Sequence, residues 1–173
     1  MILPPYRAFP TVAADKIILR QILPADIPAI VEISFYDAKQ ARTIAEAIEM
    51  QAKIDQDYLA GNSIHWAIAD RENNAVVGTC GYYRGFNQET GELGCVLLPA
   101  FRGQGYMSAA LKAAIKFGLN HMGLKRVIAI TSKQNAKAIK LLDRLGFELV
   151  SDLSDDELSY EFNNPKTDLY AKL

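Results

Sequence analysis

The sequence predicts a single domain of the α/β class, built from strands and helices in one chain. Short apolar strands alternate with amphipathic helices along most of the chain. The strand near residues 92–98 runs without a spacer into a glycine turn and then a helix. A length of 173 residues suits one domain with a sizeable core, and no repeat or inter-domain linker interrupts the pattern.

Composition and charge narrow the class of protein. Half of the residues are hydrophobic and the formal net charge is −1, which is typical of a soluble globular domain without a nucleic-acid-binding stripe. Pro4, Pro5 and Pro10 break the N-terminal apolar stretch, so neither a signal peptide nor a membrane span is expected. Cys80 and Cys95 form neither a metal-ligand spacing nor a disulfide framework. We therefore expect a cytoplasmic protein with buried thiols and no metal.

The first third of the chain predicts a lead-in, a strand and two helices. Residues 1–15 show no clear period, so we expect a loosely packed lead-in ahead of a domain spanning residues 16–173. Residues 16–21 have the pattern of a short strand, and Asp26 is a candidate N-cap for a helix. The apolar face of that helix would be Ile27, Ile30, Val31 and Ser34. A second helix over residues 43–59 would bury Ile44, Ile48, Ala52 and Leu59.

The middle of the chain predicts a hairpin followed by a third strand. Residues 64–69 and 75–83 alternate as strands around a polar turn at residues 70–74. Residues 92–98 form the next strand. Alternation places Glu92, Gly94, Val96 and Leu98 on one face and Leu93, Cys95 and Leu97 on the other.

The turn after this strand has the properties of a phosphate-binding loop. Pro99 cannot continue the ladder, and helical spacing of apolar residues begins at Met107. The turn therefore presents free backbone N–H groups at a helix N-terminus, and Gly103 and Gly105 allow a ligand to approach them closely.

The residues of this loop distinguish among the phosphate-containing ligands that it could bind. The P-loop string of glycine, four residues and Gly-Lys-Ser/Thr does not occur. A dinucleotide fingerprint needs a third glycine where Ser108 stands, and an acidic residue at the end of the next strand, which is absent there. An ordinary glycine turn into a helix remains the simplest alternative.

The last third predicts a strand, a helix and two terminal strands. Gly123 ends the long helix, residues 127–131 form a strand, and Asn135 is a candidate N-cap for a helix that ends at Gly146. The apolar face of this helix would be Ala138, Ile139, Leu142 and Leu145. Residues 148–153 and 168–173 are the expected terminal strands.

Four strings, in this order, resemble motifs of one enzyme family. Arg102-Gly103-Gln104-Gly105-Tyr106-Met107 resembles the pyrophosphate-binding loop of the GCN5-related N-acetyltransferases (GNAT), which hold acetyl-coenzyme A. Asn135 followed by Leu145-Gly146-Phe147 resembles the last helix of the same family. Leu19-Arg20 followed by Asp26, and Glu92-Leu93-Gly94, resemble its RimJ/RimL-like branch, the ribosomal-protein N-terminal acetyltransferases. The resemblance covers residues 16–173.

The resemblance implies a twisted mixed sheet whose fourth and fifth strands splay apart to admit the coenzyme. Pantetheine would pair with the fourth strand at Val96, Leu97 and Leu98. The pyrophosphate would lie on the loop formed by Arg102, Gly103, Gln104, Gly105, Tyr106, Met107 and Ser108, and Asn135 would reach the thioester end or an ordered water. Asn135 is equally well explained as a plain helix cap.

The implied reaction is direct attack of a primary amine on the thioester of acetyl-CoA in a ternary complex. Because an alkylammonium is charged at pH 7, a base must remove its proton, and Glu92 is the candidate, directly or through water. A surface carboxylate paired with a neighbouring strand is the alternative role for Glu92. A backbone N–H near Val96 or Leu97 would hold the oxyanion.

The sequence also departs from the family pattern. Leu142 and Ala138 stand where many relatives carry a tyrosine or a serine near the leaving thiolate, so no general acid is assigned. Met107 stands where alanine or glycine is usual, and it would either pack beneath the helix or narrow the loop.

Three functions therefore remain open. The first is an acetyltransferase acting on a protein N-terminus or a small-molecule amine. Its selectivity would come from residues 36–42 and the 83–87 turn. The second is a non-catalytic acyl-CoA-binding regulatory module, and the third, a dinucleotide-binding enzyme, is disfavoured by the loop. We expect no nucleic-acid or membrane partner, and a homodimer is one candidate assembly.

Overall fold

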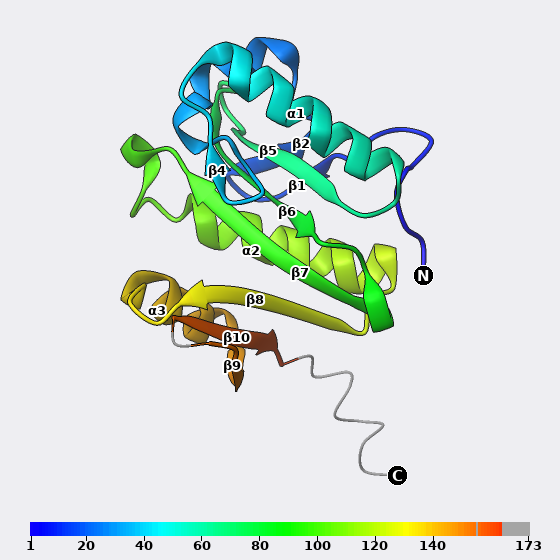
Figure 1. The fold of residues 1–173 in the computed structure, drawn as a ribbon, viewed down its shortest axis with the longest axis vertical. Coiled ribbons are helices and arrows are strands. Elements are labelled where there is room, and N and C mark those ends of the chain that lie inside the picture. The colour runs from blue at the N-terminus through cyan, green and yellow to red at the C-terminus, as the bar shows by residue number, and fades with distance from the viewer. Residues whose placement is uncertain (155, 164–173) are drawn as a thin grey trace.

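The computed structural model describes residues 1–154 and 156–163, which form one mixed sheet with helices on both faces (Figure 1). The main strands are β1 (Val12–Ala13), β2 (Ile17–Arg20), β5 (Ile64–Asp70), β6 (Val76–Tyr83), β7 (Thr90–Leu97), β8 (Arg126–Ser132), β9 (Phe147–Asp152) and β10 (Glu157–Phe162). A separate hairpin pairs β3 (Phe35–Tyr36) with β4 (Lys39–Gln40). The α-helices are α1 (Ile44–Leu59), α2 (Tyr106–Phe117) and α3 (Ala136–Leu145).

The predicted mixed α/β architecture is confirmed. Within the described residues the sheet has eight strands in the order β1-β2-β5-β6-β7-β8-β10-β9. All neighbouring pairs are antiparallel except β7 and β8. Helix α1 lies over one face, and α2 packs on the other face above the core residues Trp66, Tyr82 and Leu97 (Figure 1).

Strands β7 and β8 diverge along their length, as the resemblance implied. Their parallel ladder contains Thr90 with Arg126, Gly91 with Val127 and Glu92 with Ile128. Beyond Glu92 the pairing ends, and the two arrows separate toward their C-terminal ends in Figure 1. The last five residues of β7 therefore keep β6 as their strand partner within the described residues and leave an open backbone edge toward β8.

Residues 24–33 differ from the predicted helix. They form two short 3₁₀ segments, Pro24–Ala29 and Val31–Ile33, because Pro28 lacks the N–H that an α-helix needs at that position. Asp26 is not the N-cap. It lies inside the first segment, where its carboxylate accepts a hydrogen bond of 2.7 Å from the backbone N–H of Leu23.

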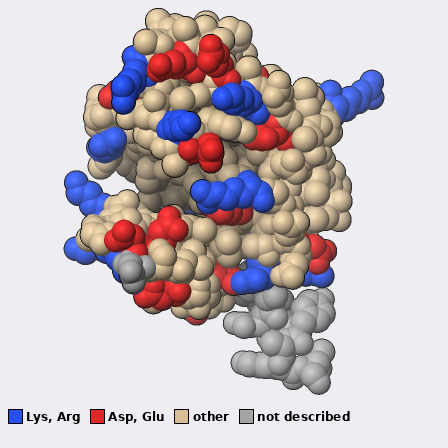
Figure 2. Space-filling view, in the orientation of Figure 1, with Lys and Arg blue, Asp and Glu red and all other residues tan. Residues whose placement is uncertain are grey.

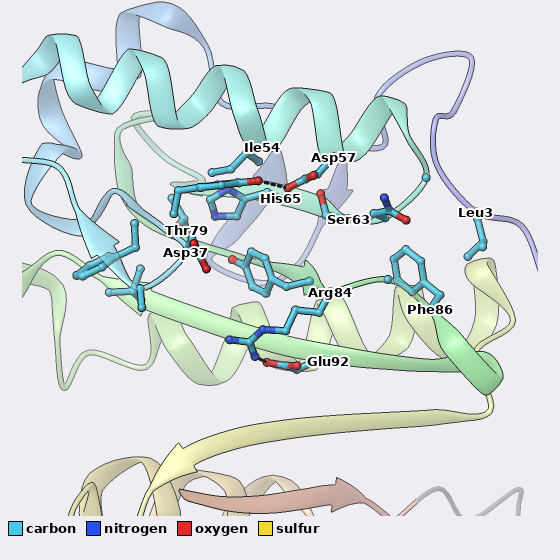
Figure 3. Close-up of a pocket in the computed structure, with 18 of the residues that line it drawn as sticks. Leu3, Asp37, Ile54, Asp57, Ser63, His65, Thr79, Arg84, Phe86 and Glu92 are labelled. Atoms are coloured by element: carbon cyan, nitrogen blue, oxygen red, sulfur yellow. Dashed lines mark hydrogen bonds and ion pairs between the residues drawn. The ribbon is translucent and has the colours of Figure 1, made fainter. Parts of the chain in front are cut away.

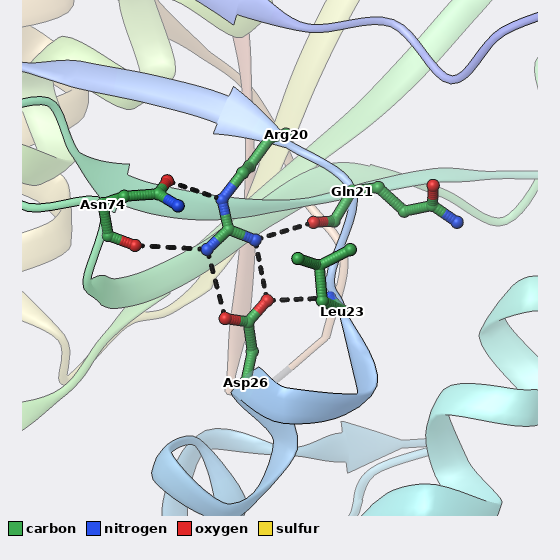
Figure 4. Close-up of polar contacts among 5 residues, drawn as sticks. All are labelled: Arg20, Gln21, Leu23, Asp26 and Asn74. Carbon is green, nitrogen blue, oxygen red and sulfur yellow. Dashed lines mark hydrogen bonds and ion pairs between the residues drawn. The ribbon is translucent and has the colours of Figure 1, made fainter.

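Asp26 also forms a forked ion pair with Arg20, and this cluster joins β2 to the start of the helical segment (Figure 4). The guanidinium of Arg20 donates to both carboxylate oxygens of Asp26 at 2.7 and 3.1 Å. It also donates to Asn74 and to the carbonyl of Gln21. The two paired side chains are only 14% and 13% exposed, so solvent screens this pair weakly.

The fork predicts that Asp26→Asn lowers the free energy of unfolding by about 2–3 kcal/mol at pH 7, measured by urea denaturation. Burial alone would raise the pKa of Asp26, but the hydrogen bonds from Arg20 and Leu23 and the charge of Arg20 lower it below its usual value. The stabilisation is therefore present above the unfolded pKa and disappears as the pH falls through the folded pKa. The difference between Asp26→Asn and wild type should accordingly shrink below about pH 4.

Glu161→Gln is the matched control for Asp26→Asn. Glu161 forms a comparable fork with Arg126, but those side chains are 26% and 47% exposed. Because this pair is more exposed, we expect Glu161→Gln to lower the free energy of unfolding by less than about 1 kcal/mol. Equal losses in the two variants would contradict the special role of the Arg20–Asp26 pair.

Helix α1 begins as predicted but turns a different face inward. The Thr43 hydroxyl caps it by accepting from the N–H of Glu46 at 3.2 Å. However, the predicted core residues Ile44, Ile48 and Leu59 are 47%, 51% and 67% exposed, and Ala52 is exposed as well. The inner face instead consists of Ala47, Met50, Gln51, Ile54, Asp57 and Tyr58.

The long helix ends at Gly123, as expected, although its last turn is wider than an α-helix. Helix α2 is followed by a π-helical turn, Gly118–Met122, and Gly123 takes a left-handed conformation at φ 76°. A Cβ at Gly118 would lie 2.3 Å from the Tyr82 hydroxyl, which donates to the Ala114 carbonyl. Glycine therefore lets Tyr82 reach the helix backbone at this point.

The two ends of the chain differ from expectation in part. The lead-in is fastened to the domain, since β1 pairs with β2 and the Trp66 indole donates to the Pro10 carbonyl at 2.9 Å. The predicted strand at 148–153 is confirmed as β9, whereas β10 was missed. The strand predicted at 168–173 lies outside the described residues. No helix in the described ranges is long and apolar enough to cross a membrane.

Candidate active site

Glu92 lies at the point where β7 and β8 stop pairing, on the sheet face that α1 covers. The predicted alternation of β7 is confirmed, because Glu92 and Val96 both line a cavity on this face while Leu93 and Leu97 enter the core. Across the β6–β7 ladder, Glu92 pairs with Tyr83 and Val96 with Thr79. These two residues of β6 also line the cavity.

The cavity has a volume of about 940 Å³ and is bounded by four parts of the chain. Strands β5, β6 and β7 form its floor, the inner face of α1 and the β3–β4 hairpin form one wall, and the turn after β6 forms another (Figure 3). Figure 2 shows the hollow on this face with acidic and basic side chains around it. The 36–42 link and the 83–87 turn both contribute lining residues, including Tyr36, Asp37, Arg84 and Phe86.

Glu92 is partly buried and forms an ion pair with Arg84 (Figure 3). Burial raises the pKa of Glu92, the charge and hydrogen bond of Arg84 lower it, and nearby Glu157 raises it, with a net increase above the usual value. The Glu92 side chain is 19% exposed, whereas that of Arg84 is 72% exposed. A cationic ligand can therefore displace Arg84 into solvent more easily than it can displace the carboxylate.

Two glycines shape the floor beside Glu92. His65, Gly81 and Gly94 form one row across β5, β6 and β7. A Cβ at Gly94 would lie 2.8 Å from the Tyr83 ring, so the glycine of the Glu-x-Gly string makes room for this tyrosine. The Tyr83 ring in turn lies 5.4 Å from the His65 ring, centroid to centroid. The row thus holds an aromatic side chain between His65 and Glu92.

Ser63 and His65 place two unsatisfied polar atoms on the same floor. In the described part of the chain, Ser63 Oγ and His65 Nδ1 are the two buried side-chain polar atoms without a hydrogen-bond partner. Both residues line the cavity. Burial lowers the pKa of His65 to about 4, so its ring is neutral at pH 7.

This low pKa predicts an acid-dependent loss of stability that His65→Phe removes. The folded pKa of about 4 lies below the unfolded value of about 6.5, so the unfolded state binds the proton more tightly. Wild-type stability should fall, relative to His65→Phe, by at most about 3 kcal/mol as the pH drops from 6.5 to 4. Urea denaturation at pH 7 and pH 4.5 measures this difference. Parallel pH profiles for the two proteins would mean that His65 titrates normally.

The predicted phosphate-binding loop has an open, left-handed backbone. Gly103 and Gly105 have φ values of 75° and 83°, and a Cβ at either position would meet nothing within 4 Å. Gly105 is the N-cap of α2, and no side chain caps this end. The first N–H groups of the helix therefore lack a side-chain cap, and a helix N-terminus of this kind favours an anion such as a pyrophosphate.

Hydrogen bonds from neighbouring side chains connect this loop to the rest of the domain. Tyr106 donates to Asp70 at 2.6 Å, and Lys16 donates to the Gln104 carbonyl at 2.7 Å while lying over the Tyr106 ring. Arg102 donates through Nε and Nη2 to the Leu97 carbonyl at 3.3 Å, so its guanidinium links the loop to the end of β7. The charged contact expected from Arg102 to a pyrophosphate stays a prediction.

Other predicted site residues occupy different surroundings. Asn135 caps α3, with Oδ1 accepting from the Ala138 N–H at 3.1 Å, and it does not line the cavity. Its contact with the thioester stays a prediction. Met107 is partly buried against the core, which is the first of the two expected outcomes. Leu142 is buried and offers no hydroxyl.

Residues 1–154 and 156–163 contain no candidate metal-binding cluster. No group of three or more His, Cys, Asp or Glu side chains there could hold an ion. Cys80 and Cys95 are free thiols that face each other across the β6–β7 ladder, and burial raises the pKa of both. The polar side chains that line the cavity include carboxylate, guanidinium, hydroxyl and imidazole groups.

Comparison with known proteins decides the family. The profile described as "Acetyltransferase (GNAT) domain" matches residues 16–148, which include β2, the Glu92 strand, the loop and α3. The chain belongs to the GNAT acetyltransferase family. The family prediction made from the four motifs is thereby confirmed.

Individual relatives are similar over most of this GNAT chain. The uncharacterized N-acetyltransferase YoaA of Bacillus subtilis (strain 168) is 27% identical over 148 residues, covering 81% of this chain and 84% of YoaA. The uncharacterized N-acetyltransferase p20 of Bacillus licheniformis is 33% identical over 125 residues, covering 71% and 66%. The acetyltransferase structure from Agrobacterium tumefaciens str. C58 matches the fold with a TM-score of 0.74 at 20% identity, covering 92% of this chain and 97% of that one.

The motifs did not reveal every polar residue of this GNAT cavity. Ser63, His65 and Asp57 line it, although no string in the sequence assigns them a role. The available signal was the period of two along β5 and β6, which places Ser63 and His65 on the face opposite Trp66. Asp57 could not be found this way, because it belongs to the face of α1 that was predicted incorrectly.

Proposed function

We propose that this protein transfers the acetyl group of acetyl-CoA to a primary amine by direct attack in a ternary complex. The observation that carries the proposal is the position of Glu92. Its partly buried carboxylate stands where β7 and β8 separate, at the edge of a cavity large enough for an acceptor. The open loop at the start of α2 supports binding of the coenzyme on the other side of this point.

The residues present support each step of the reaction. The raised pKa of Glu92, caused first by burial, makes the carboxylate a better acceptor for the proton of an incoming ammonium group. The open edge of β7 at Leu97 offers a backbone N–H to the oxyanion that develops when the amine attacks the thioester carbon, because alternate residues such as Leu98 direct their N–H groups toward β6. The leaving thiolate has an ordinary pKa of about 8.5, so it departs without an assigned general acid.

The finer assignments belong to the same proposal. The coenzyme would contact Val96, Leu97, Leu98, Asn135 and the loop from Arg102 to Ser108. Assignment to the RimJ/RimL-like branch rests on the Glu92-Leu93-Gly94 string and the Arg20–Asp26 pair. The acceptor is either a protein N-terminus or a small-molecule amine.

One observation favours a second candidate, a non-catalytic acyl-CoA-binding module. Arg84 occupies the Glu92 carboxylate, and Leu142 and Ala138 lack the hydroxyl groups found in many relatives. A screen of peptides, polyamines and small amines with acetyl-CoA, followed by thiol release, separates the two functions. Turnover of any amine supports the enzyme, whereas tight acetyl-CoA binding with no turnover across the panel supports the module.

A further inference from the structure

The floor of the acceptor cavity carries a feature that the acetyl-transfer step does not use. Ser63 Oγ and His65 Nδ1 are buried and have no hydrogen-bond partner, and both residues line the cavity (Figure 3). Ser63 directly precedes β5, and His65 is the second residue of that strand. Burying a polar atom without a hydrogen bond costs free energy. In the described part of the chain, the two buried polar atoms that lack a partner belong to residues lining the same cavity. This indicates that a bound molecule supplies their hydrogen bonds.

We propose that Ser63 and His65 form a hydrogen-bonding subsite that selects primary amines carrying a neutral amide group a few atoms from the nitrogen. This inference rests on the proposed acetyltransferase function and names its substrate class. The acceptor would place its amine near Glu92 and its amide over the floor of β5. Peptide N-termini and amides of small amino compounds both have this chemistry.

The chemistry of the two side chains fits an amide. A hydroxyl both donates and accepts, and a neutral imidazole nitrogen does one or the other, so the pair matches a group with one N–H and one C=O. Residues two apart on one face of a strand are separated by roughly 7 Å, which leaves space for an amide between the two side chains. Burial keeps His65 uncharged at neutral pH, so it does not repel an incoming cation.

The surroundings orient the acceptor between this subsite and Glu92. The Tyr83 ring packs over Gly94 and beside the His65 ring, and it lines the cavity between His65 and Glu92. On the opposite wall Asp57 accepts a hydrogen bond from Tyr36 at 3.1 Å. Its carboxylate and that of Asp37 give the cavity a negative charge that attracts an ammonium group.

The test compares two acceptors of similar length, β-alaninamide and n-butylamine, in wild type and in His65→Phe and Ser63→Ala. Intrinsic differences in amine reactivity cancel when the ratio of kcat/KM for the two acceptors is compared between proteins. Loss of one neutral hydrogen bond should lower the amide-to-alkyl ratio about fivefold to tenfold in each variant. His121→Phe is the matched control, because the only other histidine is exposed and stacks on Phe117 away from the cavity.

A binding measurement keeps the inference independent of turnover. The sequence has two histidines, so the imidazole NMR signals can be assigned with the His65→Phe and His121→Phe variants. Addition of β-alaninamide should shift the His65 signals, and Ser63→Ala should weaken this binding. An unchanged ratio in both variants, or unshifted His65 signals, overturns the subsite. Failure of wild type to acetylate any amine, with His65 signals that still shift, overturns the proposed function and leaves the subsite standing.

Discussion

Replacing Gly105 by glutamate is expected to abolish acetyl-CoA binding while the domain stays folded. Gly105 caps α2 at φ 83°, and a Cβ there points into open space. The new carboxylate would lie where the diphosphate is expected. At about 4 Å and an effective dielectric constant of about 20, two like charges repel by roughly 4 kcal/mol. This corresponds to a loss of about a thousandfold in affinity, measurable by isothermal titration calorimetry.

Gly105→Gln separates charge from backbone strain. Glutamine has the same shape as glutamate, and any L-residue in the left-handed region costs about 1–2 kcal/mol. Both variants should therefore lose similar thermal stability, well within the 5–15 kcal/mol typical of a domain. Only Gly105→Glu should lose most of its affinity. Undiminished binding by Gly105→Glu would mean that the coenzyme does not use this loop.

The loop and the Glu92 strand could be predicted from the sequence because their signals are local. Pro99 ends β7, Gly105 opens α2, and alternation along β7 assigns the face of Glu92 without knowledge of any distant contact. Asn135 and Gly146 likewise cap α3 as expected. Each of these residues determines the backbone within a few positions of itself.

The lining of the cavity beneath α1 could not be predicted, because its geometry depends on which elements pack against each other across it. Ile44 and Ile48 have helical spacing that predicts a core face, yet α1 turns Ile54 and Asp57 inward instead. A helix that borders a cavity can direct polar side chains inward, which inverts the usual periodicity argument. The role of His65 could not be predicted for a similar reason. A single polar residue in a strand does not indicate whether its hydrogen-bond partner is another part of the protein or a ligand.

Strand β10 was missed for a different reason. Its residues alternate from Glu157 to Phe162 as in a half-buried strand, but the acidic stretch just before it indicated only a turn. In the fold, β10 inserts between β8 and β9, so the chain order of the strands is not their order in the sheet. Alternation alone does not specify such an insertion.

Glu92→Gln is expected to lower kcat by more than tenfold and to leave acetyl-CoA affinity unchanged. Glutamine keeps the shape and a hydrogen bond to Arg84, but it cannot take a proton from the attacking ammonium. Steady-state kinetics with a saturating acceptor gives kcat, and calorimetry gives the affinity. Glu89→Gln is the matched control. Glu89 also forms an ion pair, with Lys125, and lies close to Glu92 in the sequence, but it does not line the cavity.

Arg84→Met then tests whether Glu92 acts as the base or only as a partner for Arg84. Arg84 lowers the pKa of Glu92 through its charge and hydrogen bond, so its removal should raise that pKa further above the usual value. A base must be deprotonated to act, and the kcat/KM profile reports the pKa of the free enzyme, in which Arg84 pairs with Glu92. The acid limb of that profile should therefore move to higher pH in Arg84→Met and vanish in Glu92→Gln. If Glu92 serves only to hold Arg84, both variants will lose activity equally and the acid limb will not move.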